Sequence, residues 1–507
     1  MAGGETKQPT KNMKPNQLLF ATLVGIQFVL PAFAVDSTAT NSTEAAEIEA
    51  LKREVQELGQ KVRALEQQRE VDQQTAAGTA KEQTQELDRK VRILARQREL
   101  DQESAAAAAK AQPRITVGAN GVNFISTDTN FALSLHGVLQ VDSRTFWGSD
   151  NIQGNSGFLL RRARPILQGT VFRDFDFMFV PDFGGNTVQI FDAYLNYRYN
   201  PALQLQAGKF KSPIGLESLQ SDVNILFNER SLATDLMPNR DLGVELHGDL
   251  FNGAVSYAVG IFNGAPDYSG TTTNADFDNN KAFVGRLFFQ PLKNSDVAAL
   301  KGFGFGVAGS YEEDRGWTNT ATGLTPGYNT DGQQKLFSYA NGVVGNGTHW
   351  RIAPQGSYYY GPLGVFGEYV ISDQQVRNVP AQLTADLQNT AWDISGSWLL
   401  TGEDASPNGV SPKHPFDPKR GQWGAWQVVG RFAELDVDNG AFPNFTNPNT
   451  SASEAKAWSA GLNWYLNRNI RFSTSFSHTM FTGGNGAGAT VTKQSENVLF
   501  TRIQLGF

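Results

Sequence analysis

Apolar side chains recur at every second position in short segments throughout the last three quarters of the chain. In the final segment, Ile503, Leu505 and Phe507 share one face, and Arg502 and Gln504 share the other. A period of two residues indicates β-strands, because successive side chains of a strand point to opposite faces of a sheet. The chain is therefore predicted to form a sheet with one apolar and one polar face.

Three features favour a membrane barrel over a soluble β-sandwich. The segments are about 10 residues long, which is the length of a tilted strand that crosses a bilayer. Aromatic residues gather near segment ends, as in the interface girdles of such barrels. The chain also stops at an aromatic residue, Phe507, as the last strand of bacterial outer-membrane barrels usually does. The clustered aromatics are Phe146, Trp147, Tyr358, Tyr359, Tyr360, Trp423 and Trp426.

Sixteen candidate strands can be placed in residues 113–507, and an even number is required if both termini are periplasmic. The predicted fold is an all-β transmembrane barrel of 16 antiparallel strands, preceded by an α-helical coiled coil. A barrel of this size encloses a water-filled lumen. The strand centres lie near residues 138, 164, 176, 193, 206, 246, 257, 286, 307, 354, 367, 395, 430, 461, 475 and 502. Gly- and Asn-rich stretches predict long outward-facing loops at 264–280, 318–347, 403–421, 438–453 and 482–490.

Residues 1–34 resemble a secretory signal peptide. Three lysines precede an apolar stretch at 18–30, and Ala32 and Ala34 form a small-residue cleavage site. A membrane anchor is the alternative, but the apolar stretch is short for a span. The mature chain is therefore expected to be exported, with residues 35–112 in the periplasm and residues 113–507 in the outer membrane.

Residues 44–110 contain a heptad pattern and an internal repeat. Blocks 57–81 and 86–110 are similar at an offset of 29 residues, one more than four heptads, and a break at Gly78 is expected to absorb the slip. The pattern predicts an oligomerising stalk that reaches the cell wall, and the alternative is a solvated helical linker without a partner. The apolar seam comprises Ile48, Leu51, Val55, Leu58, Val62, Leu65, Leu87, Val91 and Leu94.

The residue inventory argues against an enzyme. The chain has no cysteine and only five histidines, and no two of these form a local metal-binding pair. No nucleophile motif such as G-x-S-x-G is present. We therefore expect no catalytic residue, no metal site and no cofactor, and nothing in the pattern suggests nucleic-acid binding.

Seven runs of the barrel region form an ordered series of motifs. They are GFLLRRARPILQGTVFRDFDFMFVPDF (157–183), DAYLNYRY (192–199), AGKFKSPIGLESLQS (207–221), ER (229–230), GIFNGAPD (260–267), YYGPLGVFGEYV (359–370) and ENVLFTRIQLGF (496–507). Together these runs resemble the phosphate-selective porin O and P family of outer-membrane channels. The resemblance covers about residues 113–507. It implies a sixteen-stranded barrel, usually a trimer, with arginine and lysine lining a constricted pore.

The resemblance implies a set of pore-lining cations. Arg162 and Arg164 share a strand face with Gln168 and are expected to point into the lumen. The loop 211–240 is the best candidate to fold inward as the constriction. Contact with lipopolysaccharide phosphates at the rim is the alternative for the RRAR run, and a solvated turn is the alternative for the two lysines. The candidates are Arg161, Arg162, Arg164, Lys209, Lys211, Arg230, Arg240 and Arg286.

The predicted function is a passive channel for small anions, with phosphate or polyphosphate as the leading solute. Residues 113–507 carry 28 Lys and Arg against 34 Asp and Glu, so the barrel as a whole is acidic. General-diffusion transport, or transport of another solute, therefore remains an alternative. So does a structural protein that ties the outer membrane to peptidoglycan through the coiled coil. The expected partners are further copies of the chain, as a trimer, outer-membrane lipid and lipopolysaccharide, and peptidoglycan.

Overall fold

A computed structural model describes residues 44–110, 112–148, 154–185, 187–267, 278–316, 325–484 and 494–507. The chain divides into two compact units between Glu103 and Ser104, and each is described by itself. The signal peptide predicted at 1–34 lies outside the described residues. Within the described residues, no helix combines the length and the apolar character that a membrane span requires.

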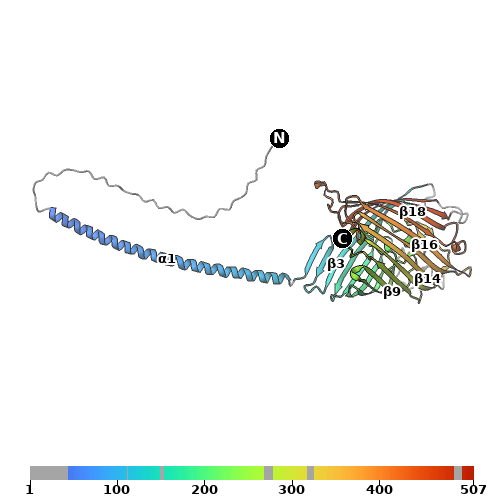
Figure 1. Cartoon of the computed structure of the whole chain (residues 1–507), viewed down its shortest axis with the longest axis horizontal. Helices are drawn as coiled ribbons and strands as arrows, with labels where there is room; N and C mark the ends of the chain where they lie inside the picture. The colour runs from blue at the N-terminus through green and yellow to red at the C-terminus, as the bar shows by residue number, and fades with distance from the viewer. Residues whose placement is uncertain are drawn as a thin grey trace, which may run out of the picture. The chain divides into compact units, whose positions relative to one another are not determined.

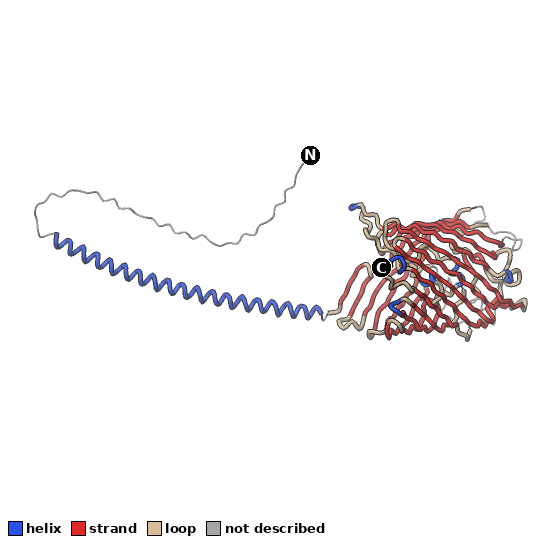
Figure 2. The backbone as a smooth tube through the Cα atoms, in the orientation of Figure 1, coloured by secondary structure: helices blue, strands red, loops and turns tan. Residues whose placement is uncertain are grey.

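The N-terminal unit is built on one helix, α1 (Glu44–Lys110) (Figure 2). It runs without interruption through Gly78, so the predicted break is wrong. No break is needed, because 29 residues equal about eight turns of 3.6 residues. The apolar seams of the two repeat blocks therefore lie within about 20° of each other around the helix axis. The seam itself is exposed in the single chain, and Leu65 is 69% exposed.

The C-terminal unit is a closed antiparallel barrel (Figure 1). Sixteen strands of the described residues form its wall, and β20 closes it by pairing with β3 from Val498↔Phe146 to Gly506↔Val138. Each of the sixteen predicted centres falls inside a different strand. The barrel strands are β3 (Ala132–Phe146), β4 (Gly157–Val171), β5 (Phe175–Asp182), β6 (Gln189–Asn200), β7 (Leu203–Lys211), β8 (Arg240–Leu250), β9 (Val255–Phe262), β10 (Ala282–Phe289), β11 (Phe303–Arg315), β14 (Val343–Tyr360), β15 (Leu363–Asn378), β16 (Leu383–Leu399), β17 (Ala425–Asp436), β18 (Ala452–Tyr465), β19 (Ile470–Gly483) and β20 (Glu496–Gly506).

The alternation in sequence sets which face of each strand meets the lumen. On β20, Arg502 and Gln504 are buried inside the barrel, whereas Ile503 is 46% exposed on the outer surface. Phe507 extends the β3 ladder through two backbone hydrogen bonds with Gly137. A side chain at Gly137 would collide with the Phe507 ring, at 2.9 Å from a Cβ, so glycine lets the terminal ring cover the seam of the barrel.

Some aromatic residues near strand ends belong to the outer surface and others to the interior. Trp426 and Trp464 stack at a centroid distance of 5.0 Å near the end of the barrel that holds the C-terminus. Phe146, by contrast, packs inside the barrel against Val498 and Phe500 and is not part of a girdle.

Other elements of this unit lie outside the barrel wall. The sequence pattern did not predict β1 (Arg114–Gly118) and β2 (Gly121–Ile125), which form a hairpin that extends the sheet from β3. The remaining elements are β12 (Tyr328–Asn329), β13 (Lys335–Phe337), α2 (Leu216–Leu219), α3 (Ala298–Lys301), η1 (Leu232–Leu236), η2 (Phe251–Gly253), η4 (Pro418–Arg420) and η5 (Asn439–Ala441).

The connection 400–424 lies at the opposite end from the one predicted. It joins β16 to β17 at the end of the barrel that holds the C-terminus, where Ala405 N–H donates to Gly361 O and Phe416 N–H donates to Leu466 O. Ala405 and Val410 pack against Tyr465 in a small apolar cluster. This long connection is stable there because it buries its own apolar side chains.

Two connections fold into the lumen. Segment 212–239, here called the inner loop, joins β7 to β8 and buries Ile214, Ile225 and Leu236 completely. Segment 325–342, between β11 and β14, lies next to it, and Asn329 N–H donates to Asp235 Oδ2 at 3.0 Å. The lumen is therefore narrowed by loops rather than filled by wall side chains.

Candidate functional site

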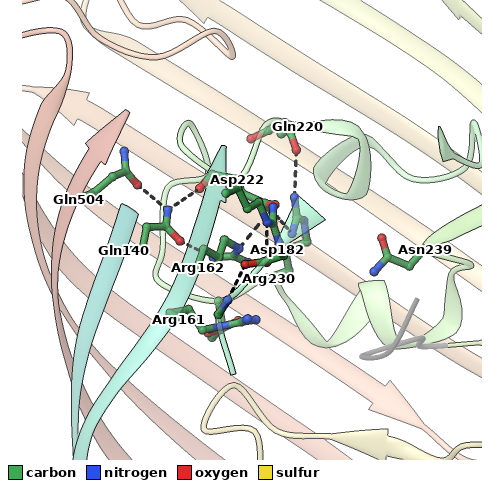
Figure 3. A network of polar contacts seen from close by, with 12 residues as sticks. Gln140, Arg161, Arg162, Asp182, Gln220, Asp222, Arg230, Asn239 and Gln504 are labelled. Atoms are coloured by element: carbon green, nitrogen blue, oxygen red, sulfur yellow. Dashed lines mark hydrogen bonds and ion pairs between the residues drawn. The ribbon is translucent and has the colours of Figure 1, made fainter. Parts of the chain in front are cut away.

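The inner loop is held against one wall of the barrel by arginines of β4 (Figure 3). Asp222 of the loop pairs with two of them and with one arginine of the loop itself. Arg164 contacts its Oδ2 directly, Arg162 Nε lies 3.5 Å away, and Arg230 of the loop lies at 2.6 Å. Gln140 of β3 donates to Asp222 O and accepts from Arg162, so it ties the strand to the same point. Asp222 is thus the first anchor of the inner loop on this wall.

A β-bulge explains how neighbouring arginines reach the same lumen. Gln140 pairs with Arg162 and Val141 pairs with Leu160, which leaves Arg161 as the extra residue of β4. Simple alternation would send Arg161 to the outer surface, but a bulge lets two consecutive side chains face the same way. Arg161 therefore reaches inward and forms a bidentate pair with Glu229, at 2.6 and 2.9 Å.

Glu229 is the second anchor of the inner loop on this wall. Besides Arg161, it accepts from Arg144 Nη2 at 2.8 Å and lies 3.7 Å from Arg502 Nη2. Arg502 is fully buried and holds Asp142 through two hydrogen bonds. The two anchors therefore join into one network, here called the arginine cluster. Its members are Arg144, Arg161, Arg162, Arg164, Arg230 and Arg502 with Asp142, Asp182, Asp222 and Glu229.

The cluster sets the ionisation of the loop carboxyls. Burial alone would raise the pKa of Asp222, but Arg162 and the other nearby cations hold it well below its usual range. The pKa of Glu229 is lowered in the same way, since Arg161 outweighs burial. For Asp235, further along the loop, burial outweighs the hydrogen bond from the Asn329 backbone N–H and raises the pKa well above the usual range.

The opposite wall holds the inner loop by a different chemistry. The Glu368 carboxylate of β15 accepts the backbone N–H groups of Leu216 and Glu217, the latter at 3.1 Å. Arg431 of β17 donates to Glu229 O at 3.0 Å, and its guanidinium lies over the Phe227 ring at 4.5 Å. The inner loop thus crosses the lumen and is bound to the wall on both sides.

Two cavities meet at the arginine cluster. One, of about 540 Å³, is lined by Arg161, Arg162 and residues 329–331. The other, of about 770 Å³, opens toward the end of the barrel that holds Phe507. Arg164, Asp222 and Arg240 line both cavities, so these three side chains flank the passage between them.

The remaining sequence candidates occupy different positions. Arg240 binds Asp192 through two contacts of 3.1 Å. Lys211 lines the second cavity and donates to Gln220 O at 2.7 Å, whereas Lys209 is 2% exposed, which excludes a solvated turn. Arg286 donates to Gln355 and, like Lys209, lines neither of the two cavities within the described residues.

The RRAR run lies inside the lumen rather than at the rim, and most of its partners were not predicted from sequence. Glu229 belongs to a run that carries the family resemblance and Asp222 directly follows another, but no residue type or spacing marked them as anchors. Arg144 and Arg502 occupy polar positions of alternating strands, which predicted their orientation but not their contacts.

One acidic group inside the barrel has the composition of a metal site. Glu312, Asp314 and His349 place their ligand atoms within 4.8 Å of one another. Arg351 already binds Glu312 at 3.0 Å and Asp267 at 2.6 Å, and Gln374 donates to Asp314. We therefore interpret this group as an ion-pair network that holds residues 264–267 against the wall.

A closed barrel of sixteen antiparallel strands, apolar outside and narrowed by an inward loop, is the architecture of an outer-membrane porin. The sequence matches the phosphate-selective porin O and P family over residues 133–507, and the chain belongs to that family. It is 23% identical over 384 residues to Porin O of Pseudomonas aeruginosa, across 70% of this chain and 84% of that protein. Family membership makes it a non-enzymatic channel protein of the outer membrane.

Several solved structures have a similar overall fold. The outer membrane channel DcaP of Acinetobacter baumannii has a TM-score of 0.49 and 12% identity, covering 76% of this chain and 99% of that one. An anion-selective porin from Comamonas acidovorans has a TM-score of 0.45 and 12% identity, covering 74% and 100%. OmpT of Vibrio cholerae, in a trimer form, has a TM-score of 0.44 and 11% identity, covering 74% and 99%.

Proposed function

We propose that this porin passes small inorganic anions, with phosphate or polyphosphate preferred, through the passage beside the arginine cluster. The observation that carries the proposal is the charge of that cluster. Six guanidinium groups surround four carboxylates, which leaves a surplus of two positive charges where the two cavities meet. A cation surplus in a partly desolvated passage attracts anions more strongly than it would in water.

Arginine suits this role for geometric reasons. Its planar guanidinium offers five N–H donors in a fork that matches the oxygens of phosphate. Anion passage also needs several weak stops rather than one tight site, so that each ion can leave. Arg161 and Arg162 line the first cavity, Arg164 and Arg240 line both, and Lys211 lines the second. This series supports stepwise transfer from the first cavity to the second.

The acidic charge of the whole barrel does not oppose this proposal. The excess of carboxylates is counted over residues 113–507, and among the described residues most of these carboxylates line neither of the two cavities. Charges on exposed loops are screened over about 8 Å at physiological ionic strength, whereas buried pairs are screened much less. The local surplus therefore determines selectivity.

Single-channel recording in a planar bilayer tests the proposal. In a KCl gradient we expect a reversal potential of the sign that chloride permeation gives, and block of the chloride current by added phosphate. Arg162→Gln and Arg164→Gln are each expected to weaken the phosphate block about tenfold, the effect of losing roughly 1.4 kcal/mol of binding. Arg286→Gln is the matched control, because it removes a lumen arginine that lines neither cavity.

Cation preference without phosphate block would contradict the proposal and leave a general-diffusion porin. Equal loss of block in the control would also contradict it, because the effect would then not be specific to the cluster.

The same proposal includes a homotrimer whose α1 helices lie in the periplasm as a coiled coil. The support is the exposed seam: Leu51, Val55 and Leu58 are each more than half exposed in the single chain. Apolar seams of this kind are covered by partner helices. Mass measurement in detergent for the whole chain and for a chain without residues 44–110 tests this point, and loss of the trimer on deletion is the expected result.

A second function is favoured by the length of α1, which at 67 residues extends about 100 Å as a straight helix. That reach supports attachment to peptidoglycan, with the barrel in contact with outer-membrane lipid and lipopolysaccharide. Deleting residues 44–110 in cells separates the two functions. Loss of envelope integrity with normal conductance would support the tether, and unchanged integrity would contradict it.

A further inference from the structure

Arg471 of β19 is buried behind the inner loop, where its hydrogen-bond partners among the described residues are neutral. It is 2% exposed, and it donates to Ile225 O at 2.9 Å and to Gln504 Oε1 at 3.2 Å. Its guanidinium carbon lies 5.7 Å from the centre of the Tyr465 ring. Within the described residues none of these partners is a carboxylate, and Arg471 Nε has no hydrogen-bond partner. A buried cation is costly unless something of opposite charge lies beside it.

Three further side chains around this point leave donors unused. Ser473 follows Arg471 on the same lumen-facing side of β19, and Arg502 is its cross-strand neighbour on β20. Ser473 Oγ and Arg502 Nη1 have no hydrogen-bond partner in the part of the chain that the structure describes. Ser473 and Arg502 therefore leave the lumen side of adjacent strands at directly opposite positions, about 4.8 Å apart along the sheet.

The inner loop places Asn228 over the same patch of wall. Leu226 O accepts from Asn463, which is the other cross-strand neighbour of Ser473, and Glu229 lies 3.7 Å from Arg502. Asn228 lies between these two loop residues and is 1% exposed. Counting described residues alone, neither its Nδ2 nor its Oδ1 has a hydrogen-bond partner. Buried polar groups are almost always satisfied, so a set of this kind requires an explanation.

We infer that Arg471, Ser473, Arg502 and Asn228 bind one small inorganic anion of halide size between the inner loop and the wall. The Ser473 hydroxyl donates its one hydrogen to the anion, together with N–H groups of Arg471, Arg502 and Asn228. An anion satisfies the donors and supplies the missing counter-charge for Arg471. Water satisfies the donors but leaves the guanidinium without a counter-charge.

This site lies outside the two cavities, although Arg502 also belongs to the arginine cluster. None of the four side chains lines either of the two cavities within the described residues. The proposed role of the anion is to lock the inner loop to β19 and β20, so it does not depend on which solute the channel carries. Its occupancy should follow chloride in the medium rather than the direction of current.

Two measurements on the whole protein test this inference. Crystals grown in bromide should show an anomalous peak within hydrogen-bonding distance of Arg471 Nε and Ser473 Oγ. The Tm of the protein should rise with chloride concentration when gluconate balances the ionic strength, because a ligand that binds only the folded state stabilises it. Ser473→Ala should flatten this dependence.

Ser477→Ala is the matched control, since Ser477 lies on the same face of β19 but already donates to Asp331 at 2.8 Å. It should keep the chloride dependence of the wild type. Density for water without anomalous signal would overturn the inference. So would a chloride dependence that is equal in the two variants, because it would then arise elsewhere, for example at the arginine cluster.

Discussion

The two walls of the lumen hold the same loop in opposite ways. On the β4 side the loop supplies the carboxylates, Asp222 and Glu229, and the wall supplies the guanidinium groups. On the β15 side the Glu368 carboxylate of the wall accepts two backbone N–H groups of the loop, and the one loop carboxylate that faces this wall, Glu217, lies 3.4 Å from Arg431 of β17. The first attachment therefore gives this part of the lumen a positive electrostatic potential as well as holding the loop. The second attachment holds the loop in position.

The two attachments therefore contribute to different properties: the first to the ion selectivity of the channel and the second to the position of the inner loop. The β4 attachment has more cations than anions, so it attracts anions to the passage as well as holding the loop. The β15 attachment satisfies the first N–H groups of helix α2, a common use of a carboxylate at a helix N-terminus. Substitutions at the two walls should consequently have different effects.

The largest effect is expected for Asp222→Ala. The change leaves Arg162, Arg164 and Arg230 without their shared partner, and breaking a buried ion pair by removing one member costs about 3–5 kcal/mol. We expect a lower Tm, and a higher single-channel conductance because the inner loop leaves the wall. Asp182→Ala is a suitable comparison, since Asp182 pairs only with Arg164 among the cluster arginines. An unchanged conductance in Asp222→Ala would contradict its role as the anchor.

Glu368→Ala should have a smaller effect, on stability alone. It removes the acceptor for two loop N–H groups, and leaving buried donors unsatisfied costs about 1–3 kcal/mol each. The Tm should fall while the reversal potential in a KCl gradient keeps its sign. Glu368→Gln retains one acceptor oxygen, so its Tm should lie between those of Glu368→Ala and the wild type. A reversed selectivity in Glu368→Ala would show that the two walls are not separable.

Glu229→Gln changes the net charge of the arginine cluster, and the side chain keeps nearly the same size and shape. Glutamine keeps a hydrogen-bond acceptor for Arg161 and Arg144 but adds one positive charge to the surplus of the cluster. We expect stronger phosphate block and slower exit, with the change in affinity near tenfold, or about 1.4 kcal/mol. The measurement is the concentration dependence of block in the bilayer. Weaker block would mean that phosphate does not bind beside this cluster.

The sequence was sufficient to predict the barrel because alternation is repeated in every strand. A spanning strand must place apolar groups outward and polar groups inward, so its pattern is imposed residue by residue. The hairpin β1–β2 lacks this constraint, since β1 is exposed along its whole length, and it was missed. The position of loop 400–424 was predicted incorrectly because length alone does not determine at which end of a barrel a loop lies.

The site was only partly predictable for a related reason. Alternation and family resemblance together identified Arg162 and Arg164, but the inward turn of Arg161 depends on a bulge that has no mark in the sequence. The partners of these arginines come from a loop with no period, and Asp222 is separated from Arg164 by 58 positions. Contacts of this kind follow from the closed shape of the barrel and not from any local pattern.

The smallest effect is expected from pH, and it follows from the ionisation of the two loop anchors. Arg162 lowers the pKa of Asp222 despite burial, and Arg161 does the same for Glu229, so both carboxyls stay ionised in acid. Such groups stabilise the fold fully above the ordinary carboxyl pKa of about 4, and this stability is lost only as the pH falls through their lowered values. Conductance and reversal potential should therefore be the same at pH 7 and pH 5. A marked rise in conductance at pH 5 would mean that the loop is released by protonation of an ordinary carboxyl, and that these anchors do not hold it.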